Sequence, residues 1–218
     1  MLKKSAHVPE PTRTAAMRAR KSSQDRKAEI LATILDLAFE VGPAHVTTGM
    51  LAGRLGLTQP AIYKHFPNKK DIWHEITNSL CARIRENLRQ GATANDPPLA
   101  MLKQLVLGHL RLVTETPALP EIIVARDPGS DLTEARQQIH AAMGEFREAL
   151  RGKLSDASKA GHLHHGLEIG DAEMLVFGVI QSLVLRLMVT RNPTLLEQDG
   201  ERLFDLQLAL MKTEGNPL

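Results

Sequence analysis

One segment in the first third of the chain, VTTGMLAGRLGLTQPAIYKHF, restricts the possible folds more than any other. Thr47 or Thr48 can cap a short helix, because a threonine side-chain oxygen accepts a free N–H group of the first helical turn. Gly56 ends that helix. Thr58 can cap a second helix, which tolerates Pro60 in its own first turn. The segment therefore predicts two short helices joined by a tight turn.

The residues around this turn are those that a close helix crossing requires. Ala52 is small enough to let the helices approach, and Gly56 can adopt the left-handed conformation that a turn of three or four residues often needs. The predicted buried side of the pair consists of Leu51, Leu55, Leu57 and Ile62. This is helix-turn-helix spacing, in which the second helix presents its N-terminal residues to the major groove of DNA.

Aromatic and basic residues are concentrated at the end of this segment and directly after it. The chain is only 3% aromatic, yet Tyr63, Phe66 and Trp73 fall within eleven residues, among several lysines. Up to Glu75 there are 12 basic and 7 acidic residues, and the remainder has 15 and 18. A tyrosine hydroxyl can donate to a phosphate while its ring packs, so the N-terminal part is expected to meet nucleic acid. Core packing alone is the alternative for Tyr63 and Trp73.

From about residue 29 to residue 76 the chain resembles the DNA-binding head of the TetR family of bacterial transcriptional regulators. The motifs that carry the resemblance are VTT, LA, LGL, AIYKHF and NKK. The resemblance implies that phosphates are contacted by Thr48, Tyr63 and Lys69, and that base edges are faced by Gln59, Ala61 and Lys64. With the rest of the motif, the predicted DNA-binding set is Thr47, Thr48, Thr58, Gln59, Pro60, Ala61, Tyr63, Lys64, His65 and Lys69. Gly49 stands where the type member of the family has a base-contacting arginine, so operator specificity does not transfer.

The rest of the chain has helical periodicity and no strand-like alternation. With 218 residues, 43% of them apolar, one or two domains are expected. The predicted fold is all-α, with about nine helices: an N-terminal three-helix helix-turn-helix head joined to a larger helical domain for ligand binding and dimerisation. The predicted divisions are a disordered basic tail at 1–22, the DNA-binding domain at 23–68, a connecting helix at 69–90 and the C-terminal domain at 91–218.

An effector pocket is predicted inside the C-terminal domain. His109 falls on the apolar stripe of one helix, and apolar residues that could line the same space are Met143, Phe146 and Phe177. Plain core packing is the alternative for each of them. Because aromatic residues are scarce, an aromatic cage for a cation is disfavoured, and the effector is expected to be apolar or weakly acidic.

The segment from Met174 to Val189 is apolar nearly all round, so both of its faces should be covered. It is interrupted by polar residues and is shorter than the roughly 20 residues of a membrane span. A second copy of the chain is the natural cover, with residues 194–211 as the other interface helix. The predicted interface residues are Leu175, Val179, Leu183, Arg186, Leu187, Leu203, Leu206 and Leu210. Arg186 should find an acidic or carbonyl partner, because an unpaired buried charge is costly.

Several other classes of site are disfavoured. The single Cys81 cannot form an internal disulfide, and no apolar leader follows the first lysines, so a reducing, cytoplasmic setting is expected. The cluster of His162, His164 and His165 could bind a metal, but residues between glycines are first of all a loop. Catalytic motifs and cofactor motifs are not found, so neither an enzyme nor a cofactor is predicted.

The sequence thus predicts a repressor that binds a pseudo-palindromic double-stranded DNA operator as a homodimer and is released by a small molecule. Two heads on one duplex match half-sites about one helical turn apart. The alternative is a constitutive DNA-binding dimer, whose C-terminal domain has no small-molecule effector and serves dimerisation or protein docking.

Overall fold

The computed structural model of the protein describes residues 22–90, 96–125 and 132–213, and helices dominate this part of the chain. The helices are α1 (Ser23–Val41), α2 (Thr48–Leu55), α3 (Gln59–Tyr63), α4 (Lys69–Gln90), α5 (Pro98–Glu115), α6 (Leu119–Val124), α7 (Thr133–Lys159), α8 (Ile169–Thr190) and α9 (Thr194–Met211). One 3-10 turn, Pro43–His45, joins α1 to α2. The predicted all-α fold of about nine helices is confirmed.

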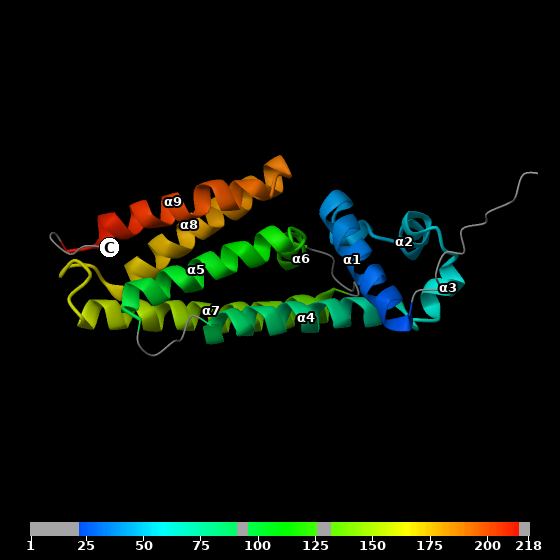
Figure 1. Ribbon diagram of the computed structural model, residues 1–218, viewed down its shortest axis with the longest axis horizontal. Coiled ribbons are helices and arrows are strands. Elements are labelled where there is room, and N and C mark those ends of the chain that lie inside the picture. Colours follow the sequence, from blue (N-terminus) through cyan, green and yellow to red (C-terminus); the bar gives the residue numbers. More distant parts are fainter. Residues whose placement is uncertain (1–21, 91–95, 126–131, 214–218) are drawn as a thin grey trace, which may run out of the picture.

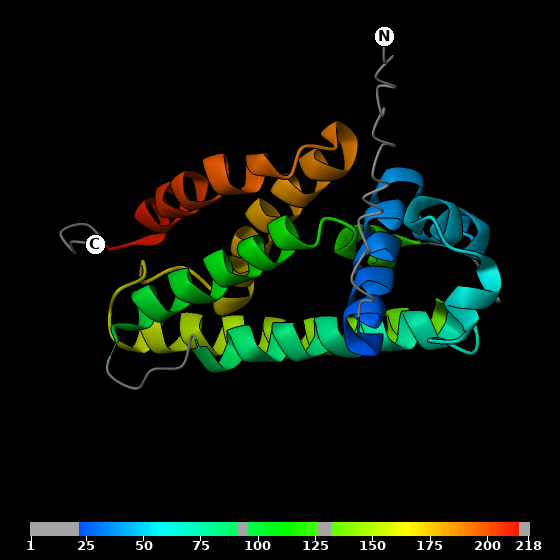
Figure 2. The same ribbon diagram turned by 45° about the vertical axis from the view of Figure 1, so that its right-hand side comes forward.

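The helices form a small group at one end of an elongated helical body (Figure 1). Helices α1, α2 and α3 make up the small group. In the body, α4 and α7 lie side by side, α5 packs on both, and α8 and α9 cover α5 and α7. The short α6 contacts α1, α7 and α8, which places it between the small group and the body (Figure 2).

Local sequence explains where the first helices begin and end. Ser22 caps α1 through a reciprocal capping box with Asp25, so Ser22 belongs to the helix and not to the predicted tail. The remainder of that tail lies outside the described residues. Helix α1 ends at Gly42, where φ is 87° and the next residue is a proline. Asn68 caps α4, accepting from the backbone N–H of Asp71 at 2.8 Å.

One continuous hydrophobic cluster runs from α1 to the end of α9. Trp73 at the start of α4 is completely buried in it, together with Ile30 and Ile34 of α1 and with Phe66. Removing such a ring costs about 3–5 kcal/mol of unfolding free energy. The small group and the body are therefore held to each other by apolar packing.

Candidate DNA-contact surface and effector cavity

The turn between α2 and α3 has the geometry that its sequence predicts. Thr47 caps α2, accepting from the Met50 N–H at 3.1 Å, and Gly56 ends the helix in the left-handed conformation with φ at 63°. Thr58 precedes α3 but makes no capping hydrogen bond with its side chain, so that prediction is wrong. The reason is local: Pro60 has no N–H group, and the N–H of Ala61 donates to the Thr58 carbonyl at 2.9 Å.

Two side-chain hydrogen bonds link three of the predicted DNA-contact residues, Tyr63, Thr48 and Gln59. The Tyr63 hydroxyl donates to Thr48 Oγ1, and Thr48 Oγ1 donates to Gln59 Oε1, each across 3.4 Å. These contacts are long for O–H···O hydrogen bonds and therefore weak. A Cβ added at Gly49 would lie 3.4 Å from Gln59 Nε2, so the glycine leaves room for this amide.

The other predicted contact residues lie on the same short helices and the start of α4. Those that are exposed are Thr47, Thr58, Pro60 and Lys64, and those that are half-buried are Ala61, His65 and Lys69. One contact between α1 and α2 was not predicted from the sequence. Arg54 of α2 makes two hydrogen bonds to Glu40 of α1, at 2.6 and 2.9 Å.

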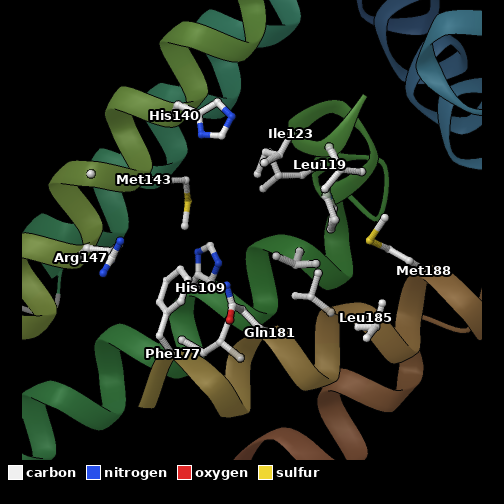
Figure 3. Close-up of a pocket in the computed structure, with 16 residues that line it drawn as sticks. His109, Leu119, Ile123, His140, Met143, Arg147, Phe177, Gln181, Leu185 and Met188 are labelled. Carbon is white, nitrogen blue, oxygen red and sulfur yellow. The ribbon is translucent and has the colours of Figure 1, made fainter. Parts of the chain in front are cut away.

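A cavity of about 540 Å³ lies between α5, α6, α7 and α8. Figure 3 shows polar side chains of α5, α7 and α8 toward one side of it and apolar side chains of α6 and the end of α8 toward the other. Its lining includes three of the four predicted pocket residues, His109, Met143 and Phe177. Phe146 does not line the cavity; it is fully buried behind His109, so the prediction for this residue is corrected. The contribution of α6 was not foreseen.

His109 joins the cavity to the core. Its side chain is buried, and its ring lies 4.5 Å from the ring of Phe146, centroid to centroid. Burial lowers the pKa of His109 to about 4, because the charged form is poorly solvated there, and the imidazole is neutral at pH 7. In the described part of the chain no group forms a hydrogen bond with this ring.

A buried acid with two arginines lies at one side of the cavity. Glu173 of α8, with only 3% of its side chain exposed, accepts from Arg147 at 2.9 Å and from Arg151 at 2.8 Å. Burial acts to raise the pKa of Glu173, but hydrogen bonds from Arg151 and Arg147 outweigh it and hold that pKa below its usual value. Arg147 also lines the cavity and lies over the Phe177 ring, at 5.2 Å.

A single arginine connects the cavity wall with the small helical group. Arg191, at the end of α8, donates to the backbone carbonyl of Phe39 in α1 at 2.8 Å and to Glu121 of α6 at 2.5 Å. It also lies over the Phe39 ring, at 5.3 Å. Its φ is 56°, a conformation that costs a non-glycine residue of order 1 kcal/mol and that surrounding contacts must maintain.

The outer surface of α8 and α9 carries exposed apolar residues, among them Leu175, Leu206 and Leu210. An apolar groove of about 410 Å³ lies there, lined by His164, Leu167, Leu175, Val179, Leu203, Leu206, Gln207, Leu210 and Met211. Leu183 and Leu187 are fully buried inside the same chain, so their predicted place in an interface is wrong. Arg186 has the acidic partner that was expected, Asp199 at 2.9 Å, but the pair is partly exposed.

Helix α8 and the turn before it bear on two other classes of site, a membrane span and a metal site. By length and composition, α8 is the one helix of residues 22–90, 96–125 and 132–213 that could cross a membrane. His162 and His164 are tied by their backbones to the end of α9: the His164 N–H donates to the Met211 carbonyl at 3.0 Å. Across the same described ranges, no three His, Cys, Asp or Glu side chains are grouped as metal ligands would be.

Two short helices joined by a glycine turn, on a helical body with a cavity between α5, α6, α7 and α8, are the arrangement of a helix-turn-helix DNA-binding regulator. The sequence model of bacterial regulatory proteins of the tetR family matches residues 30–76. The match covers most of α1, the two short helices with the turn between them, and the start of α4.

Similarity to characterised regulators extends over most of the chain. The HTH-type transcriptional regulator TtgR of Pseudomonas putida is 25% identical over 201 residues, which are 89% of this chain and 95% of the relative. The fatty acid metabolism regulator protein of Bacillus subtilis is 24% identical, over 75% of this chain and 84% of its own.

Solved structures share the fold. The SmeT–triclosan complex has a TM-score of 0.65 at 22% identity and covers 89% of this chain and 99% of its own. SmeT is described as the repressor of the multidrug efflux pump SmeDEF of Stenotrophomonas maltophilia. The ketosteroid regulator KstR2 of Mycobacterium tuberculosis has a TM-score of 0.72 at 16% identity, covering 87% and 96%.

Proposed function

We propose that this protein is a transcriptional repressor that binds operator DNA as a homodimer and releases it when a small molecule enters the cavity between α5, α6, α7 and α8. The observation that carries the proposal is the cavity itself. Its volume of about 540 Å³ lies in the range of ligand sites, and its lining is mostly apolar with a few polar groups, as in such sites. A constitutive DNA-binding dimer would have no use for it.

A route from the cavity to the DNA-binding unit supports the ligand-responsive form of the proposal. The short α6 supplies part of the cavity wall, and Glu121 on this helix is bound by Arg191, which also holds the Phe39 carbonyl in α1. A ligand switches the protein only if it binds the two states with different affinity. Displacement of α6 by a bound ligand would change its contact with α1 and favour the state with the lower operator affinity.

The assignments of the DNA-contact and interface residues belong to the same proposal. We assign residues 23–68 to the DNA-binding domain, 69–90 to a connecting helix and 91–218 to effector binding and dimerisation. Residues Leu175, Val179, Leu203, Leu206 and Leu210 form the proposed dimer surface, since they line or flank the groove on α8 and α9. A protein with this role acts in the cytoplasm, where the chromosome lies.

The test begins with selection of bound duplexes from a random pool, followed by anisotropy measurements on the selected operator. A library of small molecules is then screened for release of that operator. Gly144 lines the cavity, and an added Cβ meets nothing within 4 Å, so a side chain can start there without a clash and Gly144→Phe should occupy part of the cavity. We expect unchanged operator affinity and a loss of the response to the releasing molecule.

The matched control is Gly152→Phe. Gly152 lies on the same helix, also has open space at its Cβ position, and does not line the cavity. It should bind operator and respond to ligand like the unmodified protein. If no selected duplex binds, or if the Gly144→Phe protein still responds normally, the proposed function is wrong.

A further inference from the structure

Resting on the proposed function, the chemistry of the cavity also identifies a class of effector. We infer that the cavity binds an amphipathic monoanion, in which a carboxylate meets Arg147 and His109 and an apolar body lies against α6 and the end of α8. Figure 3 shows Arg147, His109 and Gln181 on one side and Leu119, Ile123, Leu185 and Met188 on the other. The side with the three polar groups also carries Met143 and Phe177, whereas the other side is apolar.

The first step in this inference is the charge beside the cavity. Arg147 and Arg151 share one carboxylate, that of Glu173, so the three side chains carry a net charge of +1. Glu173 is buried and uses one oxygen for each arginine. If Arg147 moved to a ligand, Glu173 would keep its bonds to Arg151 and would not become an unpaired buried charge, which is the costly state.

The position of Arg147 allows its guanidinium to turn from Glu173 to a ligand in the cavity. Arg151 does not line the cavity, whereas Arg147 does, and its guanidinium lies over the Phe177 ring, another lining residue. About half of the Arg147 side chain is exposed, so its present contacts leave part of the guanidinium free for a second partner. A planar guanidinium matches the two oxygens of a carboxylate.

His109 supplies the second observation. The ring faces the cavity, is only 5% exposed and has no hydrogen-bond partner within the described ranges. A ligand acceptor in the cavity would give this ring the hydrogen bond that it lacks. Because the imidazole is neutral, it has an N–H to donate to a carboxylate oxygen without adding a second buried charge.

The test is a binding panel measured by titration calorimetry on the full chain without DNA. The panel uses four apolar groups: octyl, decyl, dodecyl and biphenyl. Each apolar group is tested with three head groups, namely a carboxylate, a primary amide and a trimethylammonium. We expect at least one carboxylate to bind about tenfold or more tightly than its amide and its ammonium partner, because charge-assisted hydrogen bonds favour it. Equal or tighter binding of the neutral or cationic partners, or no binding of any carboxylate, would overturn the inference.

Variants of Glu173 and its two arginines should change the preference for a carboxylate over its amide partner in opposite directions. Damage to the fold would only lower this preference. Arg147→Gln should abolish the preference for the carboxylate. Arg151→Gln should lower it as well, although Arg151 does not line the cavity, because Arg147 then becomes the sole partner of Glu173. Glu173→Gln should increase it severalfold by releasing Arg147. Arg202→Gln, which removes an arginine paired with Asp199 on the α9 surface, should leave it unchanged. A Glu173→Gln protein that is folded and binds carboxylates no more tightly contradicts the inference.

The result separates this inference from the proposed function. If a carboxylate binds with the expected variant pattern but does not release the operator, the effector class is right and ligand-controlled release is wrong. If an amide or ammonium compound releases the operator and binds more tightly than its carboxylate partner, release is right and the effector class is wrong.

Discussion

At the scale of single residues, His109 makes the stability of the protein dependent on pH. Its pKa is about 4 in the folded protein and close to its ordinary value of 6.5 when the chain unfolds. Between these two values the unfolded chain binds the extra proton, so the free energy of unfolding falls as the pH falls. This residue alone should remove about 2 kcal/mol between pH 7 and pH 5.

Denaturant unfolding at several pH values measures this effect when the unmodified protein is compared with His109→Leu. Carboxylates such as Glu173, whose pKa is lowered in the fold, also reduce stability in acid, but they do so in both proteins. The difference between the two curves therefore isolates His109. The variant should lose less stability between pH 7 and pH 5, and parallel curves would mean that the histidine is already charged or solvated in the folded state.

The DNA-contact residues should separate into those that set affinity and those that read sequence. Lys69→Ala should weaken binding to operator and scrambled duplexes alike and reduce the salt slope by about one for each lost phosphate contact. Tyr63→Phe should also weaken both. Gln59→Ala should cost about 1–3 kcal/mol per half-site on the operator and little on scrambled DNA, because a side-chain amide can pair with the N6 and N7 positions of adenine. Anisotropy at several salt concentrations distinguishes these effects; equal losses on both duplexes for Gln59→Ala would exclude base reading by this residue.

At the scale of helices, the proposed route from ligand to DNA runs through the contact of Arg191 with α1 and α6, which can be removed without changing either site. Arg191→Ala deletes the hydrogen bonds to Glu121 and to the Phe39 carbonyl but no residue of the cavity lining. We expect the variant to bind the effector with nearly unchanged affinity and to need at least about tenfold more of it for release of the operator, since a coupling of 1–3 kcal/mol is typical.

Calorimetry with the effector and anisotropy with the operator provide the two readouts for this variant. Arg202→Ala is a suitable control, because it also removes an ion-paired arginine but contacts Asp199 on the outer surface of α9. Normal release by Arg191→Ala would show that the signal passes by another route, for example through the α4–α7 contact. Weaker effector binding instead would mean that Arg191 shapes the cavity.

The helices show what local sequence can predict and what it cannot. Caps and glycine turns act within a few residues, so Thr47 and Gly56 have their predicted roles. Thr58 does not, because the backbone around Pro60 meets the same need without its side chain. Phe146 could not be separated from the cavity lining by periodicity, because it lies on the buried stripe of α7, directly beside the partly exposed stripe with Met143 and Arg147 that lines the cavity. The pairings of Arg191 and Glu173 join residues from different helices, and only the tertiary structure brings them together.

At the scale of the whole molecule, the single chain covers only one of the two apolar faces of α8, and the second cover stays a prediction. Leu183 and Leu187 face the core of the same chain, whereas Leu175 lies in the open groove and is half exposed. An apolar run on every side of a helix shows that two covers are needed, but its sequence does not say which residues meet which cover. Leu206 and Leu210 of α9 are exposed, so the second cover should lie against the side of α8 that is next to these residues.

If that second cover is another copy of the chain, a charge in the groove should break the dimer. Leu206→Glu places an unpaired carboxylate in the contact twice, because an isologous interface repeats each residue. We expect dissociation into monomers at micromolar concentration, observed by sedimentation, and a loss of operator affinity of at least about a hundredfold, because two linked heads bind far more tightly than one. The helical content should be unchanged, since Leu206 is exposed in the single chain.

The charge-matched control for this experiment is Gln198→Glu, an exposed position of the same helix that does not line the groove. It should remain dimeric and bind operator normally. Monomers in the unmodified protein would contradict the homodimer itself. A Leu206→Glu protein that stays dimeric would instead place the interface elsewhere, and the groove on α8 and α9 would then need a different occupant. A Leu206→Glu monomer that still binds the operator with full affinity would show that dimerisation does not contribute to recognition, because the energetic advantage of two linked heads would be absent.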